Sequence, residues 1–289
     1  MIDRRLMLAG GGGALALGLW QARGLAAVAL HGDPAADFAL QGQLTQGGWA
    51  RGKAPAGTRS LAFNARAVLL APDRSFFIAF DRDAAPRAEL AALLSDGATS
   101  QGSFAVSPRA WQIEHIPLGP RPGGPANPAY ARIREAELAQ INTARSVDHA
   151  ISGWRQNFIW PVFGRISGRF GAQRIYNGTP GSYHSGLDIA TGTSGTPFTA
   201  PADGVVTLAA QSPFSLEGRL LMIDHGAGLN SAFLHCSSHA VAAGDVVRQG
   251  QFIGRIGKTG RATGPHLHWS LKWRDSRLDP LLFVGAMRK

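Results

Sequence analysis

Short apolar runs separated by glycines fill residues 158–283, and this pattern constrains the fold more than any other feature of the chain. The 289 residues include 37 glycines. The runs show no helical period, which favours a predominantly antiparallel sheet. We expect six strands in this part of a mainly β protein, at residues 187–190, 204–208, 219–224, 231–235, 252–256 and 266–271.

Two histidines lie one residue apart in the last of these runs, His266 and His268. On a strand, side chains alternate between the two faces, so this pair points the same way. His184 and Asp188 form a second pair, followed by a short apolar run. Imidazole and carboxylate groups suit zinc, and three protein ligands plus water are typical of a catalytic zinc site. We favour this interpretation over a set of unconnected histidines.

An ordered series of short motifs surrounds these residues. It comprises Tyr183 to Ala190, Gly195-Thr196-Pro197, Ala200 to Val206, Ile223 to Gly226, Phe233-Leu234-His235, Gly244 to Val247, Gly257 to Gly260 and Thr263 to Trp269. In order and spacing, this series resembles the lysostaphin/LytM-type zinc metallopeptidases, which cut peptidoglycan cross-links. The resemblance covers about residues 158–283. It implies an antiparallel β-sheet metallopeptidase domain with a substrate groove and one zinc ion on the groove floor.

The resemblance also implies a role for each of five residues. His184, Asp188 and His268 correspond to the zinc ligands, and His235 and His266 to the histidines that flank the metal-bound water. Zinc supplies hydroxide near neutral pH and polarises the scissile carbonyl. A histidine beside it can accept a proton or stabilise the developing oxyanion.

The predicted function is therefore that of an exported zinc endopeptidase that hydrolyses amide bonds in peptidoglycan peptide cross-links. The alternative is a non-catalytic cell-wall binding or amidase-activating module on the same fold. Such relatives typically lack one or more metal residues, whereas all five positions are occupied here by the residue types of the enzymes. The five residues thus favour the enzyme.

Residues 1–29 have the pattern of an export signal: Arg4 and Arg5, a mildly apolar segment to Trp20, and a small-x-small sequence ending at Ala29. The arginine pair suggests the twin-arginine route. We expect the mature protein in the periplasm or cell wall. We expect no membrane anchor after cleavage, because no internal span reaches about 18 apolar residues.

The formal net charge of +10 raises the question of nucleic acid binding. The basic residues are scattered and accompany no nucleic-acid-binding module, so we expect the anionic cell wall as the partner instead. The single cysteine, Cys236, excludes an intrachain disulfide. Although Cys236 follows His235 directly, we interpret it as a small buried hydrophobe and not as a metal ligand.

Upstream of residue 158 we expect two further parts. Residues 30–118 predict a small β-sandwich-like domain, with a hairpin at 68–71 and 76–80 and later strands at 104–106 and 111–116. Residues 119–157 predict a Pro/Gly linker and then a helix from Asn127-Pro128 to about residue 153. We expect this helix to pack on the metallopeptidase domain, 158–289; the alternative is a helix that blocks the groove in a latent form.

Two weaker motifs have structural interpretations. Gly257-Lys258-Thr259-Gly260 lacks the upstream glycine of a phosphate-binding loop, so we expect a connection between two strands. His225 precedes Gly226 at a predicted strand end, and we interpret it as structural. His31, His115, His149 and His239 have no motif around them, and we expect no functional role for them.

Overall fold

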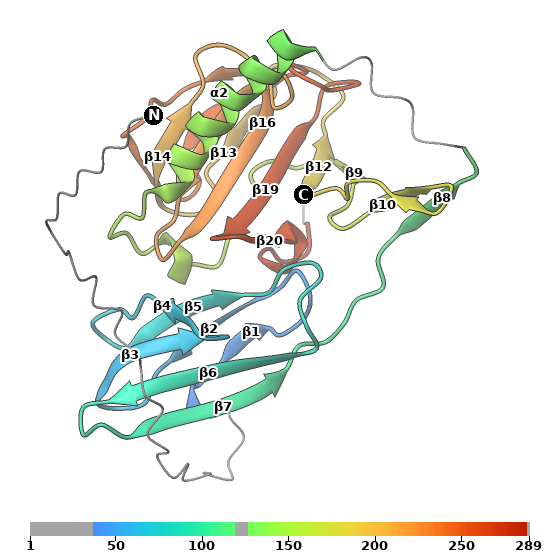
Figure 1. Ribbon diagram of the computed structural model, residues 1–289. Helices are drawn as coiled ribbons and strands as arrows, with labels where there is room; N and C mark the ends of the chain where they lie inside the picture. The colour runs from blue at the N-terminus through green and yellow to red at the C-terminus, as the bar shows by residue number, and fades with distance from the viewer. Residues whose placement is uncertain (1–36, 119–126, 288–289) are drawn as a thin grey trace, which may run out of the picture. The chain divides into compact units, whose positions relative to one another are not determined.

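The computed structural model describes residues 37–118 and 127–287 (Figure 1). The predicted export signal, residues 119–126 of the predicted linker, and His31 lie outside the described residues. Strands dominate and the sheets are mainly antiparallel, which confirms the predicted fold class. No helix within the described ranges is both long and apolar enough to cross a membrane.

Two antiparallel sheets form most of residues 37–118. One has the order β1 (Gln41–Gln43), β2 (Trp49–Lys53), β5 (Ser75–Ala79); the other has the order β4 (Arg66–Val68), β3 (Thr58–Phe63), β6 (Arg87–Leu94), β7 (Thr99–Ala105). In β6, Ala88, Leu90 and Ala92 are buried and alternate with more exposed residues, the period expected of a strand with one face in a core. Phe80 joins the sheets by packing edge-on against Phe63, at 5.9 Å between ring centroids.

The predicted hairpin at 68–71 and 76–80 is wrong. β4 pairs with β3 and β5 pairs with β2, so the two runs belong to different sheets. Asn64 and Ala65, with φ of 47° and 63°, form the two-residue turn that joins β3 to β4. Positive φ at both central residues matches the twist of a hairpin, and β4 is therefore already paired before the chain turns at residues 71–74.

β8 (Ile113–Ile116) pairs in parallel with β10 (Gln173–Tyr176), which also pairs with β11 (Thr179–Pro180). We expected 111–116 to add a strand to the N-terminal sheets. It instead forms a small separate sheet with residues that follow it by about sixty positions.

The largest sheet is antiparallel throughout and contains ten strands. Its main path is β17 (Val246–Val247), β14 (Gly204–Ala209), β15 (Arg219–Asp224), β16 (Leu229–His239), β19 (Leu267–Trp273), β12 (Leu187–Ala190) and β9 (Arg165–Gly168), with β13 (Pro197–Thr199), β18 (Phe252–Ile256) and β20 (Ser276–Leu278) attached. All six strands predicted here are present, with bounds that differ by a few residues at most. Trp269, Phe198 and Phe233 are among the largest fully buried side chains.

Helix α2 (Pro128–Ser146) begins as predicted, because the Asn127 side chain accepts hydrogen bonds from the backbone N–H groups of Ala129 and Tyr130. It ends at Ser146 instead of about residue 153. The chain then extends, and both the backbone N–H and the ring of His149 bind the buried Asp224 carboxylate, at 2.6 and 2.9 Å. Two 3₁₀ turns follow later, η1 (Gly153–Arg155) and η2 (Pro280–Leu282).

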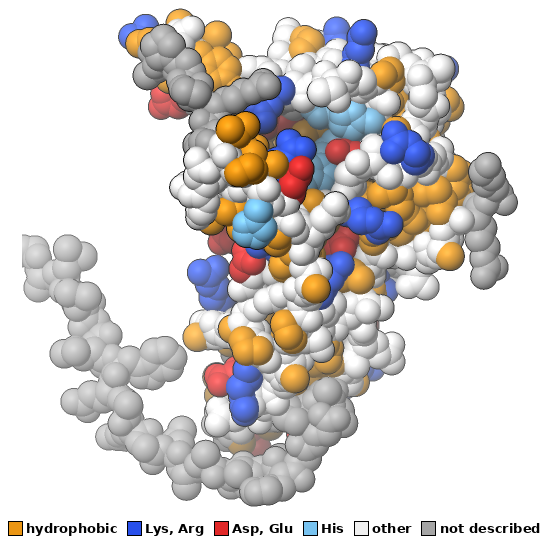
Figure 2. All heavy atoms as spheres, turned by 90° about the vertical axis from the view of Figure 1, so that its right-hand side faces the viewer, with side chains coloured by type: hydrophobic (Ala, Val, Ile, Leu, Met, Phe, Trp, Pro, Cys, Tyr) orange, Lys and Arg blue, Asp and Glu red, His pale blue; other side chains and the backbone are white. Residues whose placement is uncertain are grey.

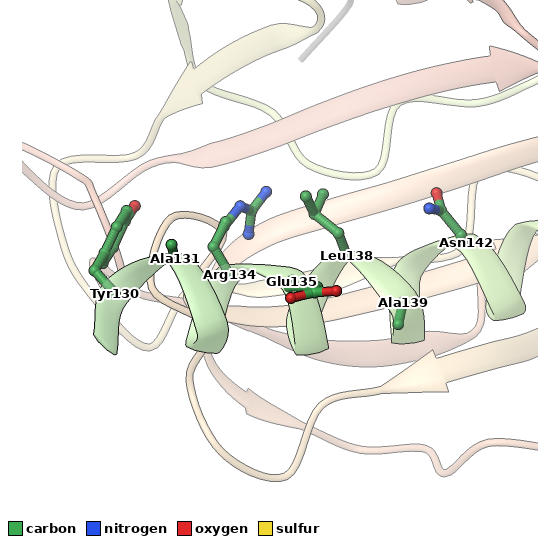
Figure 3. A pocket seen from close by; sticks show the side chains of 7 residues that line it. All are labelled: Tyr130, Ala131, Arg134, Glu135, Leu138, Ala139 and Asn142. Carbon is green, nitrogen blue, oxygen red and sulfur yellow. The ribbon is translucent and has the colours of Figure 1, made fainter. Parts of the chain in front are cut away.

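The helix lies across one face of the largest sheet (Figure 1). Ile141 and Ala144 pack there with Phe214, Leu220 and Met222. Other large side chains of the helix are partly exposed, including Tyr130 and Leu138. Figure 3 shows them on the helix beside a shallow hollow of about 600 Å³, whose described lining residues all belong to the helix.

The N-terminal sheets and the largest sheet share one continuous hydrophobic core. Phe77 of β5 packs against Trp273 of β19, at 6.3 Å between ring centroids. The Trp49 indole donates a hydrogen bond to the Leu282 carbonyl at 2.8 Å, and Arg51 donates to the Trp154 carbonyl at 2.7 Å. Residues described on both sides of the linker therefore stabilise one another.

His225 is fully buried at the end of β15, as its structural interpretation requires. Nδ1 donates to the Asp203 carbonyl and Nε2 accepts from the Ser231 hydroxyl, both at 2.7 Å. Burial lowers the pKa of His225 from 6.5 to about 4. Between about pH 6.5 and 4, the ring is therefore neutral in the folded protein and protonated in an unfolded chain.

We expect this difference to make stability depend on pH. Between pH 6.5 and 4 the unfolded state binds more protons at His225, so its contribution is complete above pH 6.5 and declines as the pH falls. Lowering the pH from 7.5 to 5 should cost about 2 kcal/mol at this group. Urea unfolding of His225→Gln should lack that part of the pH dependence, with the exposed His115→Gln as control. Equal pH dependence in His225→Gln and the wild type would contradict the assignment.

Candidate metal centre and groove

Strand register brings Asp188 and His268 together. The two residues are direct partners in the antiparallel pair β12–β19, so their side chains lie on the same face. The His268 Nδ1 atom is 2.8 Å from Asp188 Oδ1. His266 lies two residues before His268, and its Nε2 atom is 3.7 Å from the same carboxylate oxygen. The predicted same-face arrangement of the histidine pair is therefore present.

His184 reaches this cluster from the segment that precedes β12. Its backbone N–H donates to Ala172 O and its carbonyl accepts from Gly171 N, both at 2.8 Å. Its Nδ1 lies 3.1 Å from the Arg169 carbonyl; because a carbonyl can only accept, Nδ1 carries the proton. The other ring nitrogen, Nε2, lies 3.1 Å from both Asp188 Oδ1 and His268 Nδ1.

An irregularity in β16 directs His235 to the same place. His235 has a φ of 65°, and two residues of β16, Leu234 and His235, lie opposite one residue of β15. Such a bulge re-aims a side chain. β16 also changes partner at this point, from β19 at Leu234 to β18 at Cys236. The His235 and His266 rings are consequently 4.9 Å apart.

His184, Asp188 and His268 fit a metal ion. Their candidate ligand atoms all lie within 4.8 Å of one another, and the contacts to the shared Asp188 oxygen are 2.8 and 3.1 Å. Donors on a tetrahedral zinc ion are separated by about 3.3 Å, given zinc–ligand bonds near 2.05 Å. The Nδ1–H of His184 is held by a backbone carbonyl, which is how metal-binding histidines are commonly oriented.

Two glycines leave room for this cluster. A Cβ atom on Gly186 would lie 2.5 Å from His268 Nε2, and one on Gly168 would collide with the Asp188 carboxylate. Neither glycine has a positive φ. Glycine is therefore needed at both positions because His268 and Asp188 lie so close, and not because of the backbone conformation.

The charges in the cluster stabilise one another. Burial alone would raise the pKa of Asp188, but hydrogen bonds from His184 and His268 outweigh burial and hold it well below its usual range. Burial likewise opposes protonation of His184, yet the Asp188 carboxylate raises its pKa overall. His235 has no such carboxylate contact, and burial lowers its pKa to about 4. An ionised carboxylate therefore lies beside histidines of different basicity.

A groove extends on both sides of Asp188. Cavities of about 710 and 330 Å³ share Ser167, Asp188 and Thr263 in their linings. Figure 2 shows histidine side chains gathered in a hollow on one face, next to an acidic side chain and with basic side chains around it. No residue of α2 is among the described residues that line either cavity.

The larger cavity is lined partly by residues that the sequence analysis did not identify. Gln112 and Glu114 come from the segment around β8, and Arg169 and Arg174 from β10 and the loop before it. Arg174 Nε donates to Glu114 at 2.7 Å. The parallel pairing of β8 with β10 places Glu114 opposite Arg174, and the sequence carries no local signal for that pairing.

Cys236 points away from the groove into the core. It is fully buried, its thiol contacts the Phe233 carbonyl at 3.5 Å, and burial raises its pKa to about 12. Its environment is that of the small hydrophobe that we expected.

Residues 257–266 form the expected connection between β18 and β19. Within this connection, the Thr259 carbonyl accepts a hydrogen bond from the Nδ1–H of His235 at 2.8 Å.

Comparison with known proteins identifies the class of domain that contains this site. Residues 182–280 match the model of peptidase family M23. The matched segment includes all five candidate site residues, and the chain carries an M23 peptidase domain.

Two curated relatives match less than half of this chain. The chain is 37% identical over 120 residues to the DD-carboxypeptidase/endopeptidase Mpg of Neisseria meningitidis, a match that covers 42% of this chain and 27% of that protein. It is 40% identical over 108 residues to the peptidoglycan DD-endopeptidase ShyA of Vibrio cholerae, covering 37% and 24% respectively. The chain thus spans about a quarter of the length of these relatives.

One solved structure resembles nearly the whole described chain. A putative M23 peptidase from Pseudomonas aeruginosa aligns over 84% of this chain and 96% of its own, with a TM-score of 0.65 and 28% identity. Because the match extends well beyond residues 182–280, it includes much of the N-terminal region as well as the M23 domain.

Gly186→Ala should weaken metal binding without removing a candidate ligand. The new methyl group would press on His268 Nε2 and on the Trp269 carbonyl, at 2.5 and 2.7 Å, and so displace His268. We expect zinc affinity to fall at least about 10-fold, as for the loss of an orienting contact. Chelator competition measures this, with Gly285→Ala, which meets nothing within 4 Å, as control. Unchanged affinity in Gly186→Ala would show that the close packing has no role at the site.

Proposed function

We propose that this protein is an exported zinc-dependent endopeptidase that hydrolyses amide bonds in peptidoglycan peptide cross-links. The observation that carries the proposal is the convergence of His184, Asp188 and His268 on the floor of a groove, with His235 and His266 beside them. The M23 domain and the names of its peptidoglycan-cleaving relatives support it.

His184, Asp188 and His268 would hold one zinc ion, through Nε2, the carboxylate and Nδ1 respectively. When bound, zinc lowers the pKa of a water molecule to about 7 and polarises a carbonyl group. The low pKa of Asp188 keeps its carboxylate ionised at neutral pH, which favours a cation at this position.

His235 and His266 would move protons. Each donates its Nδ1–H to a backbone carbonyl, of Thr259 at 2.8 Å and of Gly264 at 2.9 Å. These bonds fix the tautomer and leave each Nε2 free to accept a proton from water or, once protonated, to donate it to the leaving amine. Two such rings 4.9 Å apart can act on opposite sides of one peptide bond.

The groove and the inferred export both support the proposed substrate. The groove is open enough for an extended peptide, and Arg165, Arg169 and Arg174 make its lining basic. Export, inferred from the first 29 residues, would bring the basic chain to an anionic cell wall. A non-catalytic wall-binding module is disfavoured, because none of the five chemical positions has been lost.

Digestion of purified sacculi tests the activity and identifies the bond together. The zinc-loaded protein should release cross-linked peptide fragments that mass spectrometry resolves. His268→Ala and Asp188→Ala should release none and should bind less than one zinc per chain, while keeping the wild-type circular dichroism spectrum. Full lysis by both variants would exclude the proposed metal centre.

A second pair of variants separates proton transfer from metal binding. His235→Ala and His266→Ala should each retain about one zinc, because neither residue is a proposed ligand. Each should lower kcat by about 10²- to 10⁴-fold, the usual contribution of general acid–base catalysis. Zinc content and kcat on sacculi are the measurements. Loss of zinc from either variant would instead make that histidine a ligand.

A further inference from the structure

Arg82 is a buried arginine of the N-terminal region that belongs to none of the proposed catalytic groups. It lies between β5 and β6, and only 6% of its surface is exposed. A buried guanidinium is costly unless its N–H groups are paired. The contacts of Arg82 therefore indicate which part of the structure it stabilises.

Every nitrogen of Arg82 has a partner, and two of the three hydrogen-bonding partners lie beyond the linker. Nε and Nη2 both donate to the Gly171 carbonyl, at 3.3 and 3.1 Å, and Nη2 also donates to Gln173 at 3.0 Å. Nη1 forms an ion pair with Asp83 at 2.7 Å. The guanidinium also lies over the rings of Tyr183 and Trp111, at 4.6 and 5.2 Å from their centroids.

These partners adjoin His184 directly. Gly171, whose carbonyl Arg82 binds, donates its own N–H to the His184 carbonyl at 2.8 Å. Tyr183, over which Arg82 stacks, precedes His184 in the chain. Phe170 packs against both Trp111 and Tyr183, at 5.7 and 6.0 Å between ring centroids. The loop that fixes the backbone of His184 is thus itself held by Arg82.

Gly171 shows how closely this loop is held. Its φ is 80°, and a Cβ atom there would collide with the Trp111 ring. The peptide carbonyl that Arg82 binds is therefore confined by the indole as well as by two hydrogen bonds. Arg169, whose carbonyl orients the His184 ring, lies two residues earlier in the same loop.

We propose that Arg82 is a positioning residue for the zinc ligand His184, so that the N-terminal β region completes the metal centre of the M23 domain. This inference rests on the proposed function, because it assumes that His184 binds zinc. Arg82 does not touch the metal. It fixes the loop at residues 169–173, and the loop fixes both the backbone and the ring nitrogen of His184.

Arg51 provides a matched control. It also belongs to the N-terminal sheets and also donates to backbone carbonyls beyond the linker, those of Trp154 and Gln156. It stacks on Trp49 at 4.6 Å. Its partners lie around η1 and not in the loop that carries His184. Loss of Arg51 removes a comparable contact between the two regions without releasing that loop.

The test compares the zinc affinities of the full-length wild type, Arg82→Met, Arg82→Lys, Arg51→Met and His184→Ala by chelator competition. We expect Arg82→Met to bind zinc about 10-fold more weakly, the lower end of the range for groups that orient ligands. Arg82→Lys should be intermediate, because an ammonium keeps the charge but not the planar fork. Arg51→Met should remain within about twofold of the wild type. Saturating zinc should restore kcat in Arg82→Met but not in His184→Ala.

The outcomes distinguish this inference from the proposed function. If wild type and His184→Ala bind zinc equally, the metal centre itself is wrong. If His184→Ala loses zinc but Arg82→Met and Arg82→Lys keep wild-type affinity, the positioning role of Arg82 is excluded and the proposed function stands. Equal weakening in Arg82→Met and Arg51→Met would also exclude it, as a general effect of loosened packing. Should Arg82→Met fail to fold, Arg82→Lys against Arg51→Met decides.

Discussion

The pairing of Asp188 with His268 across β12 and β19 is the constraint on which the site depends. Side chains alternate along a strand, so a slip of one residue would turn one of the two groups to the opposite face. The neighbouring positions prevent that slip. Leu187 is the partner of Trp269, and Ile189 of Leu267, and all four are fully buried on the other face. The apolar core thus sets the register, and the register sets the distance between two polar groups.

His235 and His184 reach the site from irregular segments of the backbone. His235 reaches the site because β16 bulges and exchanges β19 for β18 as its partner. His184 reaches it from a segment held by hydrogen bonds to Gly171 and Ala172, outside any strand. Regular pairing supplies a rigid floor, and the irregular segments direct side chains onto it. A bulge with a φ of 65° at a non-glycine residue is tolerated because the backbone of His235 is itself hydrogen-bonded to Glu217.

Features that depend on neighbours in sequence were predictable, and features that depend on remote contacts were not. Asn127-Pro128 predicted the start of α2 correctly, because helix capping involves residues that are adjacent in sequence. Its end at Ser146 was not predicted, and the segment after it is held by Asp224, which binds His149 from 75 positions away. The spacing of the histidine motifs and their resemblance pointed to His184, Asp188 and His268, which the structure brings together as a candidate metal cluster. The parallel pairing of β8 with β10, which brings Glu114 to the groove, left no local signal, because both strands are short and half-exposed.

Because the N-terminal and C-terminal sheets share one core, residues outside the M23 match also help to fix the geometry of the site. Trp49 packs against Phe283 and Phe77 against Trp273, so the C-terminal sheet buries part of its surface under N-terminal side chains. Trp111 and Arg82 continue that contact to the loop beside His184. An M23 domain cut from the chain at residue 158 would lose the second strand partner of β10 and would expose aromatic surface. The N-terminal sheets therefore restrict the positions of the groove walls, although the candidate metal ligands that the described residues provide all come from residues 184–268.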